Sequence, residues 1–285
     1  NIDSYRIVRE SLPPNHRTAR PAREESMRVF VINLARAEAR RRHMLRQLTE
    51  LGLEAEFHEA VDGRHLTKEQ YAQVDRNIRK RLGLKPQADG SIANWLSQRR
   101  VMQEVAENGP EVFAIFEDDA ELSPDLPPVL AALEQRPLAF DIVKLNRRAP
   151  EKAFVSSMRL PTGHSLGRVR YHDFGCEGYV ITREAARRFL AATPRMTWEI
   201  DQAINYYWEN GLNILYLDPP VVFHGGRDAS QIEEGRALAR QRHRRTANPA
   251  YVLWRRGIQS IEREFSRRRE FQRRLREDRT GIGRT

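Results

Sequence analysis

The chain has 285 residues, a formal net charge of +10, 40% hydrophobic residues and one cysteine. This length can bury a sizeable core, and the hydrophobic fraction excludes wholesale disorder. One cysteine excludes an internal disulfide and a cysteine-based zinc site, which fits a reducing compartment. No stretch has the apolar length of a membrane span or the character of a signal peptide, so we expect a cytoplasmic protein.

Composition divides the chain into three parts. Residues 1–26 are polar and contain several prolines, which predicts an extension outside the folded domain. We expect the domain itself to span residues 27–250. Much of the excess positive charge lies in residues 251–285, which predict a basic, amphipathic helical extension.

Apolar periodicity predicts strands and helices in alternation. A strand at 29–34, a helix at 37–51 and a strand at 57–61 form a β-α-β unit, the usual beginning of a nucleotide-binding α/β sheet. The later elements expected in chain order are helices at 67–81 and 91–108, a strand from 112, a helix at 126–135, strands at 141–145 and 175–181, helices at 182–190 and 200–208, and a strand at 214–217 that leads to 221–226. Residues 147–172 predict an irregular active-site loop.

The most informative segment is the apolar run Val112–Phe116, which ends in Glu117, Asp118 and Asp119. Consecutive apolar residues suit a strand buried on both faces. Ligands of open α/β sheets bind beyond the carboxyl ends of strands, so these acids would face the ligand. Adjacent carboxylates are tolerated most easily when Mg²⁺ or Mn²⁺ shares their oxygens. The alternative is an acidic turn into solvent.

Residues after the first two strands are candidates for nucleotide binding. Arg36 and Arg40 follow Asn33-Leu34 at a helix start, where nucleotide phosphates lie in α/β folds. The alternative is a solvated arginine face. Asp62-Gly63 would bind a nucleoside hydroxyl or form only a turn.

Two further residues are candidates for the chemistry. His224 follows an apolar segment, and an imidazole there would complete an Mn²⁺ site if the fold brings it to the acidic motif. Asp201 lies near a predicted helix start. It would act as a general base, although acids are also favoured at helix N-termini for dipole and capping reasons.

The order of these motifs resembles glycosyltransferase family 25, which includes bacterial lipooligosaccharide galactosyltransferases and animal procollagen galactosyltransferases. The matching segments within residues 28–226 are Val29–Arg36 with Arg40-Arg41, Ala60–Gly63, Phe116–Ala120, Gly175–Arg183, Ile200-Asp201 and Leu217–Pro220. The resemblance implies a GT-A-like α/β fold, with a mixed sheet flanked by helices. It also implies a UDP-sugar donor, an Mn²⁺ or Mg²⁺ cofactor and inversion at the anomeric carbon.

The resemblance implies nucleotide contacts for Asn33, Arg36 and Asp62, and ribose, cation and diphosphate contacts for Glu117 and Asp119; the residue patterns described above add the other candidates. We expect the nucleotide-sugar site to contain Asn33, Leu34, Arg36, Arg40, Asp62, Gly63, Gln98, Glu117 and Asp118. The expected metal ligands are Asp119, Glu117 and His224, and the expected catalytic carboxylates are Asp201 and Glu177. Two departures stand out. Family members commonly carry Gly-Cys and Ser-His where this chain has Ala93-Asn94 and Ser97-Gln98, and Glu177 replaces a usually small residue.

We therefore expect a cytoplasmic hexosyltransferase that acts on a surface glycan or glycolipid such as lipopolysaccharide. The resemblance to galactosyltransferases makes galactose the first candidate for the transferred sugar. The alternative is an inactive protein of the same fold that uses its basic surface to bind membrane or nucleic acid. The altered Ala93-Asn94 and Gln98 favour that alternative, and the intact acidic motif opposes it. We do not expect nucleic acid as the partner, because no standard binding pattern accompanies the charge.

The C-terminal extension carries an apolar stripe. Its members are Tyr251, Trp254, Ile258, Ile261 and Phe265. We expect this face to pack on the domain or on a second subunit as a homodimer, with a mobile basic segment beyond Phe265 attracted to anionic lipid. Such a tail would make the enzyme peripheral at the inner face of the cell membrane.

Overall fold

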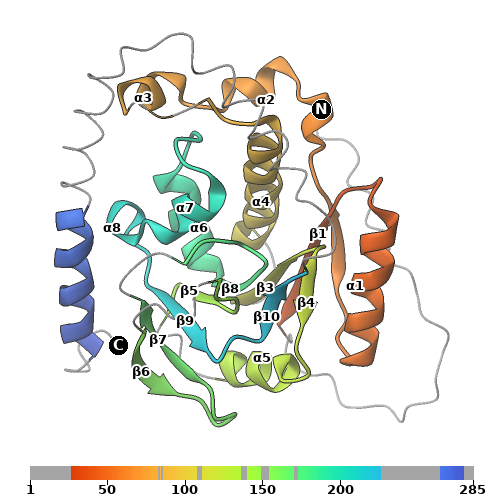
Figure 1. Cartoon of the computed structure of the whole chain (residues 1–285), viewed down its shortest axis with the longest axis vertical. Helices are drawn as coiled ribbons and strands as arrows, with labels where there is room; N and C mark the ends of the chain where they lie inside the picture. Colours follow the sequence, from red (N-terminus) through yellow and green to blue (C-terminus); the bar gives the residue numbers. More distant parts are fainter. Residues whose placement is uncertain are drawn as a thin grey trace.

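The computed structural model describes residues 27–82, 84, 86–107, 111–135, 140–148, 154–169, 173–225 and 264–278. An eight-stranded mixed sheet forms its centre, in the order β2-β1-β3-β8-β5-β9-β7-β6 (Figure 1). The strands in that order are Glu56–Glu59, Arg28–Asn33, Val112–Glu117, Gly178–Thr182, Ile142–Lys144, Ile214–Asp218, Ser165–Val169 and Phe154–Arg159. A small second sheet pairs β4 (Ala120–Leu122) with β10 (Val222–His224) in antiparallel orientation.

Helices cover both faces of the large sheet. They are α1 (Glu38–Glu50), α2 (Lys68–Ala72), α3 (Arg76–Arg81), α4 (Asp89–Glu107), α5 (Leu126–Glu134), α6 (Arg183–Ala192), α7 (Ile200–Asn205) and α8 (Tyr207–Asn210). Alternation along β3 explains the two layers, since successive side chains of a strand point to opposite faces. Phe113 and Ile115 pack with residues of α4, α6 and α7, whereas Ala114 and Phe116 pack with α1 and α5. The predicted mixed α/β sheet flanked by helices is confirmed.

The site edge of the sheet is formed by β1, β3 and β8. β1 and β3 are parallel, with Ile32 opposite Glu117, so their carboxyl ends meet. β8 runs antiparallel on the other side of β3, with Gly178 opposite Phe116. A side chain on Gly178 would lie 2.8 Å from the Phe116 ring, so the missing Cβ permits this close pairing.

Several predicted elements differ from the observed ones. The helix expected at 67–81 is two short helices, because Val74 between them forms a bridge with the distant Met196. The helix expected at 200–208 breaks at Tyr206, whose φ of −84° and ψ of 58° are not helical. The expected loop at 147–172 contains the hairpin β6-β7, and β4 was not predicted.

The C-terminal extension is helical over residues 264–278, as predicted, but the expectation of a mobile segment beyond Phe265 is wrong. Residues 264–278 form a helix (blue in Figure 1) that lies against α8 and β7. Asp278 accepts hydrogen bonds from Arg168 at 2.7 and 2.9 Å, and Arg274 donates to the Gly211 carbonyl at 3.2 Å. Phe271 is buried, whereas Phe265 is 71% exposed. Docking therefore uses the segment that was expected to be mobile.

The rest of the predicted apolar stripe, from Tyr251 to Ile261, lies outside the described residues. So do the predicted N-terminal extension, 1–26, and the end of the predicted domain, 226–250. Within the described part of the chain, no helix combines the length and apolar character needed to cross a membrane.

Candidate functional site

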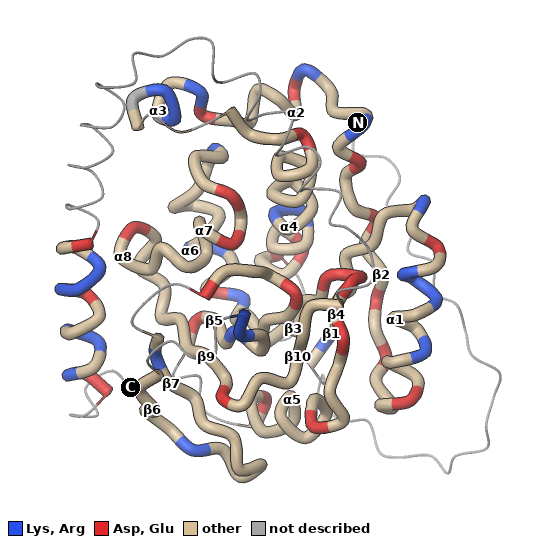
Figure 2. Tube along the Cα trace, viewed as in Figure 1, with Lys and Arg blue, Asp and Glu red and all other residues tan. Residues whose placement is uncertain are grey.

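The carboxyl ends of β1 and β3 bring Asn33 and Asp118 together. The Asn33 Nδ2 donates to Asp118 Oδ2 at 2.7 Å, and both side chains are buried. The backbone N–H of Asp118 donates to the Ile32 carbonyl at 3.2 Å, so the hydrogen bonding between β1 and β3 continues to the second residue of the acidic motif. As predicted, the acids lie just beyond a buried strand; Figure 2 shows this β3–β4 junction in red.

Arg40 reaches the acidic motif from the first turn of α1. Its Nη1 lies 3.4 Å from Asp118 Oδ1 and 3.9 Å from Asp119 Oδ2. This cation was expected to neutralise phosphates, and in the structure it pairs with the acids. A phosphate bound here would therefore meet a cation already held in place by the chain. Asp119 Oδ1 is buried and has no hydrogen-bond partner among the described residues.

Arg36 and Asp62 form a second pair at the surface. Arg36 Nε donates to Asp62 Oδ2 at 2.9 Å, and Arg64 Nη2 lies 3.1 Å from the same oxygen. The hydrogen bond from Arg36 contributes most, and that from Arg64 next, to a pKa of Asp62 well below its usual value. Gly63 begins a 3₁₀ turn, where an added Cβ would lie 3.0 Å from the Asp89 backbone, so this glycine permits contact with α4. Leu34 lies in the turn before α1, and its carbonyl accepts from Ala37.

Gln98 on α4 connects Glu117 to the sheet interior. Its Nε2 donates to Glu117 Oε1 at 3.3 Å, and its Oε1 accepts from the Tyr179 hydroxyl at 2.6 Å. Asn94, one turn earlier on the same helix, donates to Glu117 Oε1 at 3.1 Å. Burial and the charges of Asp119 and Glu177 nevertheless raise the pKa of Glu117 to about 8.

Glu177 is fully buried and lies beside the acidic motif. Its carbonyl accepts from the Glu117 backbone N–H at 3.0 Å. Its carboxylate accepts from Asn146 Nδ2 at 2.6 Å, forms an ion pair with Arg148, and lies 3.6 Å from His224 Nδ1. The fold therefore brings His224 to the site, as expected. Glu177 itself has no exposed side-chain surface, so the predicted catalytic carboxylate does not reach a substrate in the observed conformation.

Asp201 reaches the same segment from the start of α7. Its Oδ2 accepts from the Gly175 backbone N–H at 3.3 Å, and its Oδ1 accepts from the N–H of Gln202 at 2.8 Å. Gly175 has a φ of +101°, in the left-handed region. The predicted base thus lies near Glu177, and it also orders the turn that carries Gly175.

The charges at this edge of the sheet are unbalanced. Burial contributes most to the raised pKa values of Glu117 and Asp119; the charges of Asp119 and Glu177 add to the shift of Glu117, and those of Asp118 and Glu177 to the shift of Asp119. The buried, unpartnered Asp119 oxygen adds to this excess. Clustered carboxylate oxygens are typical ligands of divalent cations such as Mg²⁺ and Mn²⁺. The carboxylates offer the oxygen donors that a divalent cation needs, but in this structure the ligand atoms of Glu117, Asp119 and His224 do not gather within 4.8 Å of one another.

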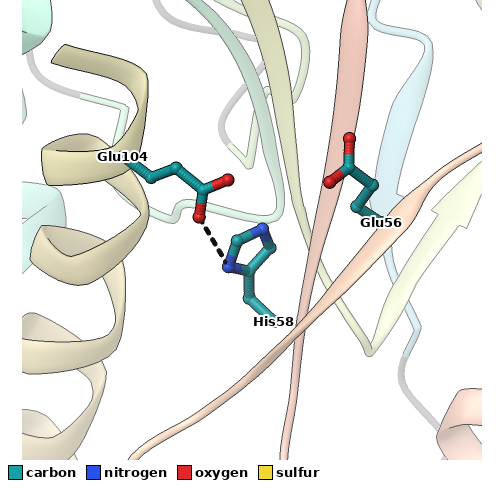
Figure 3. A group of neighbouring side chains, drawn as sticks. All are labelled: Glu56, His58 and Glu104. Carbon is teal, nitrogen blue, oxygen red and sulfur yellow. Dashed lines mark ion pairs between the residues drawn. The ribbon is translucent and has the colours of Figure 1, made fainter. Parts of the chain in front are cut away.

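Among the described residues, a different set brings three candidate ligand atoms within 4.8 Å of one another: Glu56, His58 and Glu104 (Figure 3). Arg28 already donates to Glu56 at 2.8 Å through Nε and Nη2, and to Glu104 at 3.2 Å. Its guanidinium supplies the positive charge that these glutamates require. This set therefore forms a structural ion-pair network at the edge of the large sheet.

Four residues of the site were not assigned roles from the sequence. They are Asn94, Asn146, Arg148 and Tyr179. The spacing of Asn94 and Gln98 places both on one face of α4, which could have indicated a shared partner. Asn146 and Arg148 come from the end of β5, and only the pairing of β5 with β8 brings them to Glu177. No sequence signal marks that contact.

Comparisons with known proteins identify the family. The family described as glycosyltransferase family 25 (LPS biosynthesis protein) matches residues 27–204. Human procollagen galactosyltransferase 2 is 29% identical over 179 residues, which cover 58% of this chain and 28% of that protein. A bovine protein named probable inactive glycosyltransferase 25 family member 3 is 26% identical over 226 residues, covering 72% of this chain and 35% of its own.

Among solved structures, a glycosyltransferase involved in glycosylation of the major capsid of PBCV-1 aligns with 76% of this chain and 99% of its own, at 10% identity and a TM-score of 0.39. The chain spans about a third of the length of the curated relatives named above. The family match covers more than half of the chain, including β1, the acidic motif, Glu177 and Asp201. The chain belongs to glycosyltransferase family 25.

Proposed function

We propose that this chain transfers a hexose, galactose in the first instance, from a UDP-sugar to a surface glycan or glycolipid, with inversion and with a divalent cation. The observation that carries the proposal is the crowding of Glu117, Asp119 and Glu177 at the carboxyl end of β3, beside a buried carboxylate oxygen without a partner. A divalent cation would offset the negative charge of these carboxylates and would in turn bind the diphosphate of a donor. Membership of the family supports glycosyl transfer as the reaction.

Residues of the chain divide the work between donor and acceptor. Arg36 and Asp62 would bind the nucleoside, and Asn33 would hold Asp118 in place for it. Asp201 would accept the proton of the acceptor hydroxyl as its oxygen bonds to the anomeric carbon. The bond between that carbon and the diphosphate breaks on the opposite face, and the diphosphate leaves with the electron pair.

A metal ion at this site would be held by Asp119 and Glu117, with His224 close by. When bound, it would stabilise the negative charge of the leaving diphosphate. The protein's part is to keep these carboxylates together, which the hydrogen bonds from Asn94 and Gln98 to Glu117 do in its absence.

Donor binding can be tested by thermal shift. A panel of nucleotide sugars is added with Mn²⁺, because a ligand that binds only the folded state raises the melting temperature. We expect one UDP-sugar to stabilise the wild type, and the shift to disappear in excess chelator. No shift with any nucleotide sugar would contradict the proposal.

A second candidate is a family member that binds donor without transferring it. The feature in its favour is Gln98, where the family resemblance leads us to expect histidine; its side chain donates to Glu117 and accepts from Tyr179. The bovine relative named as probably inactive shows that the family name includes such proteins. The two candidates differ in one readout, the release of nucleoside diphosphate, which only a transferase catalyses.

The proposed glycolipid acceptor implies a cellular location for the enzyme. We propose a cytoplasmic enzyme at the inner face of the membrane, where a lipid-linked acceptor is concentrated. Flotation with anionic and neutral vesicles tests this location. Recovery of the chain with neither kind of vesicle at low salt would contradict a peripheral attachment.

A further inference from the structure

Arg148 is a cation at the centre of the acidic site that the sequence did not reveal. Its Nε and Nη2 contact the carboxylate of the buried Glu177, and the charges of Glu117 and Asp201 also act on it. We propose that Arg148 is a donor-binding residue, whose guanidinium binds the diphosphate of the nucleotide sugar while Glu177 holds it in position. This inference rests on the proposed function and assigns a further residue to it.

The backbone around Arg148 is shaped for this contact. The Arg148 N–H donates to Asp173 Oδ1 at 3.0 Å. A Cβ on Gly175 would lie 2.3 Å from Glu177 Oε2 and 2.7 Å from Arg148 Nε, so only glycine lets the chain fold this closely over the pair. Lys144 donates to the Gly175 carbonyl from beneath. These contacts order the backbone on both sides of the Arg148–Glu177 pair.

The neighbouring arginine shows what a purely structural ion pair looks like in this fold. Arg147 is 2% exposed in its side chain and is enclosed by Asp173 and Asp218. Arg148 has 49% of its side chain exposed, although its partner Glu177 has none. A cation that served only to neutralise the buried Glu177 could itself be buried, as Arg147 is beside its own partners. The exposure leaves one edge of the guanidinium accessible from the side where the donor would lie.

The chemistry of guanidinium suits this double role. Its planar fork presents five N–H donors and binds phosphate oxygens through two parallel hydrogen bonds. Nε and Nη2 face Glu177, so Nη1 lies at the opposite edge of the planar group, away from that carboxylate. As the sugar–diphosphate bond breaks, its electron pair passes to a phosphate oxygen. Arg148 keeps its proton and donates hydrogen bonds to the oxygens that gain charge.

Calorimetric titration tests the inference without measuring turnover. UDP and uridine are titrated with Mn²⁺ into the wild type, Arg148→Gln and a control, Arg42→Gln. Arg42 is an exposed arginine paired with Glu38 at 3.3 Å. We expect Arg148→Gln to weaken UDP binding about 10- to 100-fold, the loss of a charged hydrogen-bonded contact. Uridine affinity should stay unchanged, as should both affinities of the control.

A second pair of variants protects the test against misfolding, since Arg148→Gln leaves Glu177 buried without its cation. Glu177→Gln keeps Arg148, and the double variant with Arg148→Gln removes both charges. We expect Glu177→Gln to bind UDP at least as tightly as the wild type, and the double variant to bind it about 10- to 100-fold more weakly. Equal UDP affinity in these two variants would overturn the role of Arg148 and would leave the proposed function standing. A wild type that binds no nucleoside diphosphate would overturn the proposed function as well.

Discussion

The two halves of the site carry acids of the same kind in different states. In the half formed by β1 and α1, Asp118 has a hydrogen bond from Asn33 and an ion pair with Arg40. In the half formed by β3 and β8, Glu117 and Asp119 face each other and Glu177, and their pKa values are raised. The first half is neutralised by the chain itself. In the second half, burial and neighbouring acids disfavour the charged forms of Glu117 and Asp119, and a bound cation would favour them again, so that is where we expect the chemistry.

The largest effect should come from Asp201→Asn. This variant keeps an oxygen that can accept from Gly175 or Gln202 but removes the carboxylate that would take the acceptor proton. We expect turnover to fall about 1000-fold, within the usual range for a general base, with donor affinity nearly unchanged. Turnover is measured as UDP release, and donor affinity by calorimetry. If only donor affinity falls, Asp201 is a binding residue instead.

The next variant, Asp119→Asn, acts on the crowded half directly. It removes one charge at the end of β3, where little packing is lost, so the melting temperature should stay close to that of the wild type. Turnover should fall at least about 100-fold, because the leaving diphosphate loses its electrostatic stabilisation. Glu121→Gln is the matched control, since Glu121 lies two residues on and pairs with His43. Equal losses in both variants would argue against a specific role for Asp119.

Gln98→Leu tests, through stability, the contact of α4 with the half formed by β3 and β8. The substitution removes an amide that bonds Glu117 and Tyr179 in the buried interior. We expect a loss of about 1–3 kcal/mol in the free energy of unfolding, the usual result of leaving buried polar groups unpaired. Urea denaturation measures it. Gln103→Leu, at an exposed position of the same helix, should change stability by far less; a comparable loss there would refute the explanation.

The smallest effect is a change in pH dependence. Burial and the charges of Asp119 and Glu177 raise the pKa of Glu117 from 4.5 to about 8 in the folded protein. Between these values the folded protein holds a proton that the unfolded chain has lost, so stability falls as pH rises through this range. Without donor or metal, Glu117→Gln should flatten the fall. Parallel stability curves for the variant and wild type from about pH 5 to about pH 8 would contradict the raised pKa.

The parts of this structure that the sequence predicts are those set by local pattern. The apolar run of β3 and the acids after it are read directly, because burial on both faces leaves a continuous apolar segment. The same reasoning places β1, α1 and β8 close to their observed bounds. Asn33, expected at the nucleotide site from the family resemblance, meets Asp118 because the parallel strands β1 and β3 bring their carboxyl ends to one edge.

The parts that the sequence does not predict depend on distant partners. Val74 divides a predicted helix because it pairs with Met196, far along the chain. Arg148 meets Glu177 only through the register of β5 against β8. In the C-terminal helix, Phe271 is buried and Phe265 is exposed because α8 and β7 determine which face docks. A one-dimensional apolar stripe carries none of this information.

The most direct test of the account is the release of nucleoside diphosphate from a panel of nucleotide sugars, with Mn²⁺ and a bacterial glycolipid extract as acceptor. Mass spectrometry follows the free nucleotide and the extended acceptor together. We expect the wild type to release UDP from one UDP-sugar, with matching gain of a hexose on the acceptor, and Asp119→Asn to do so at least about 100-fold more slowly. Equal release by the wild type and Asp119→Asn for every sugar would contradict the account.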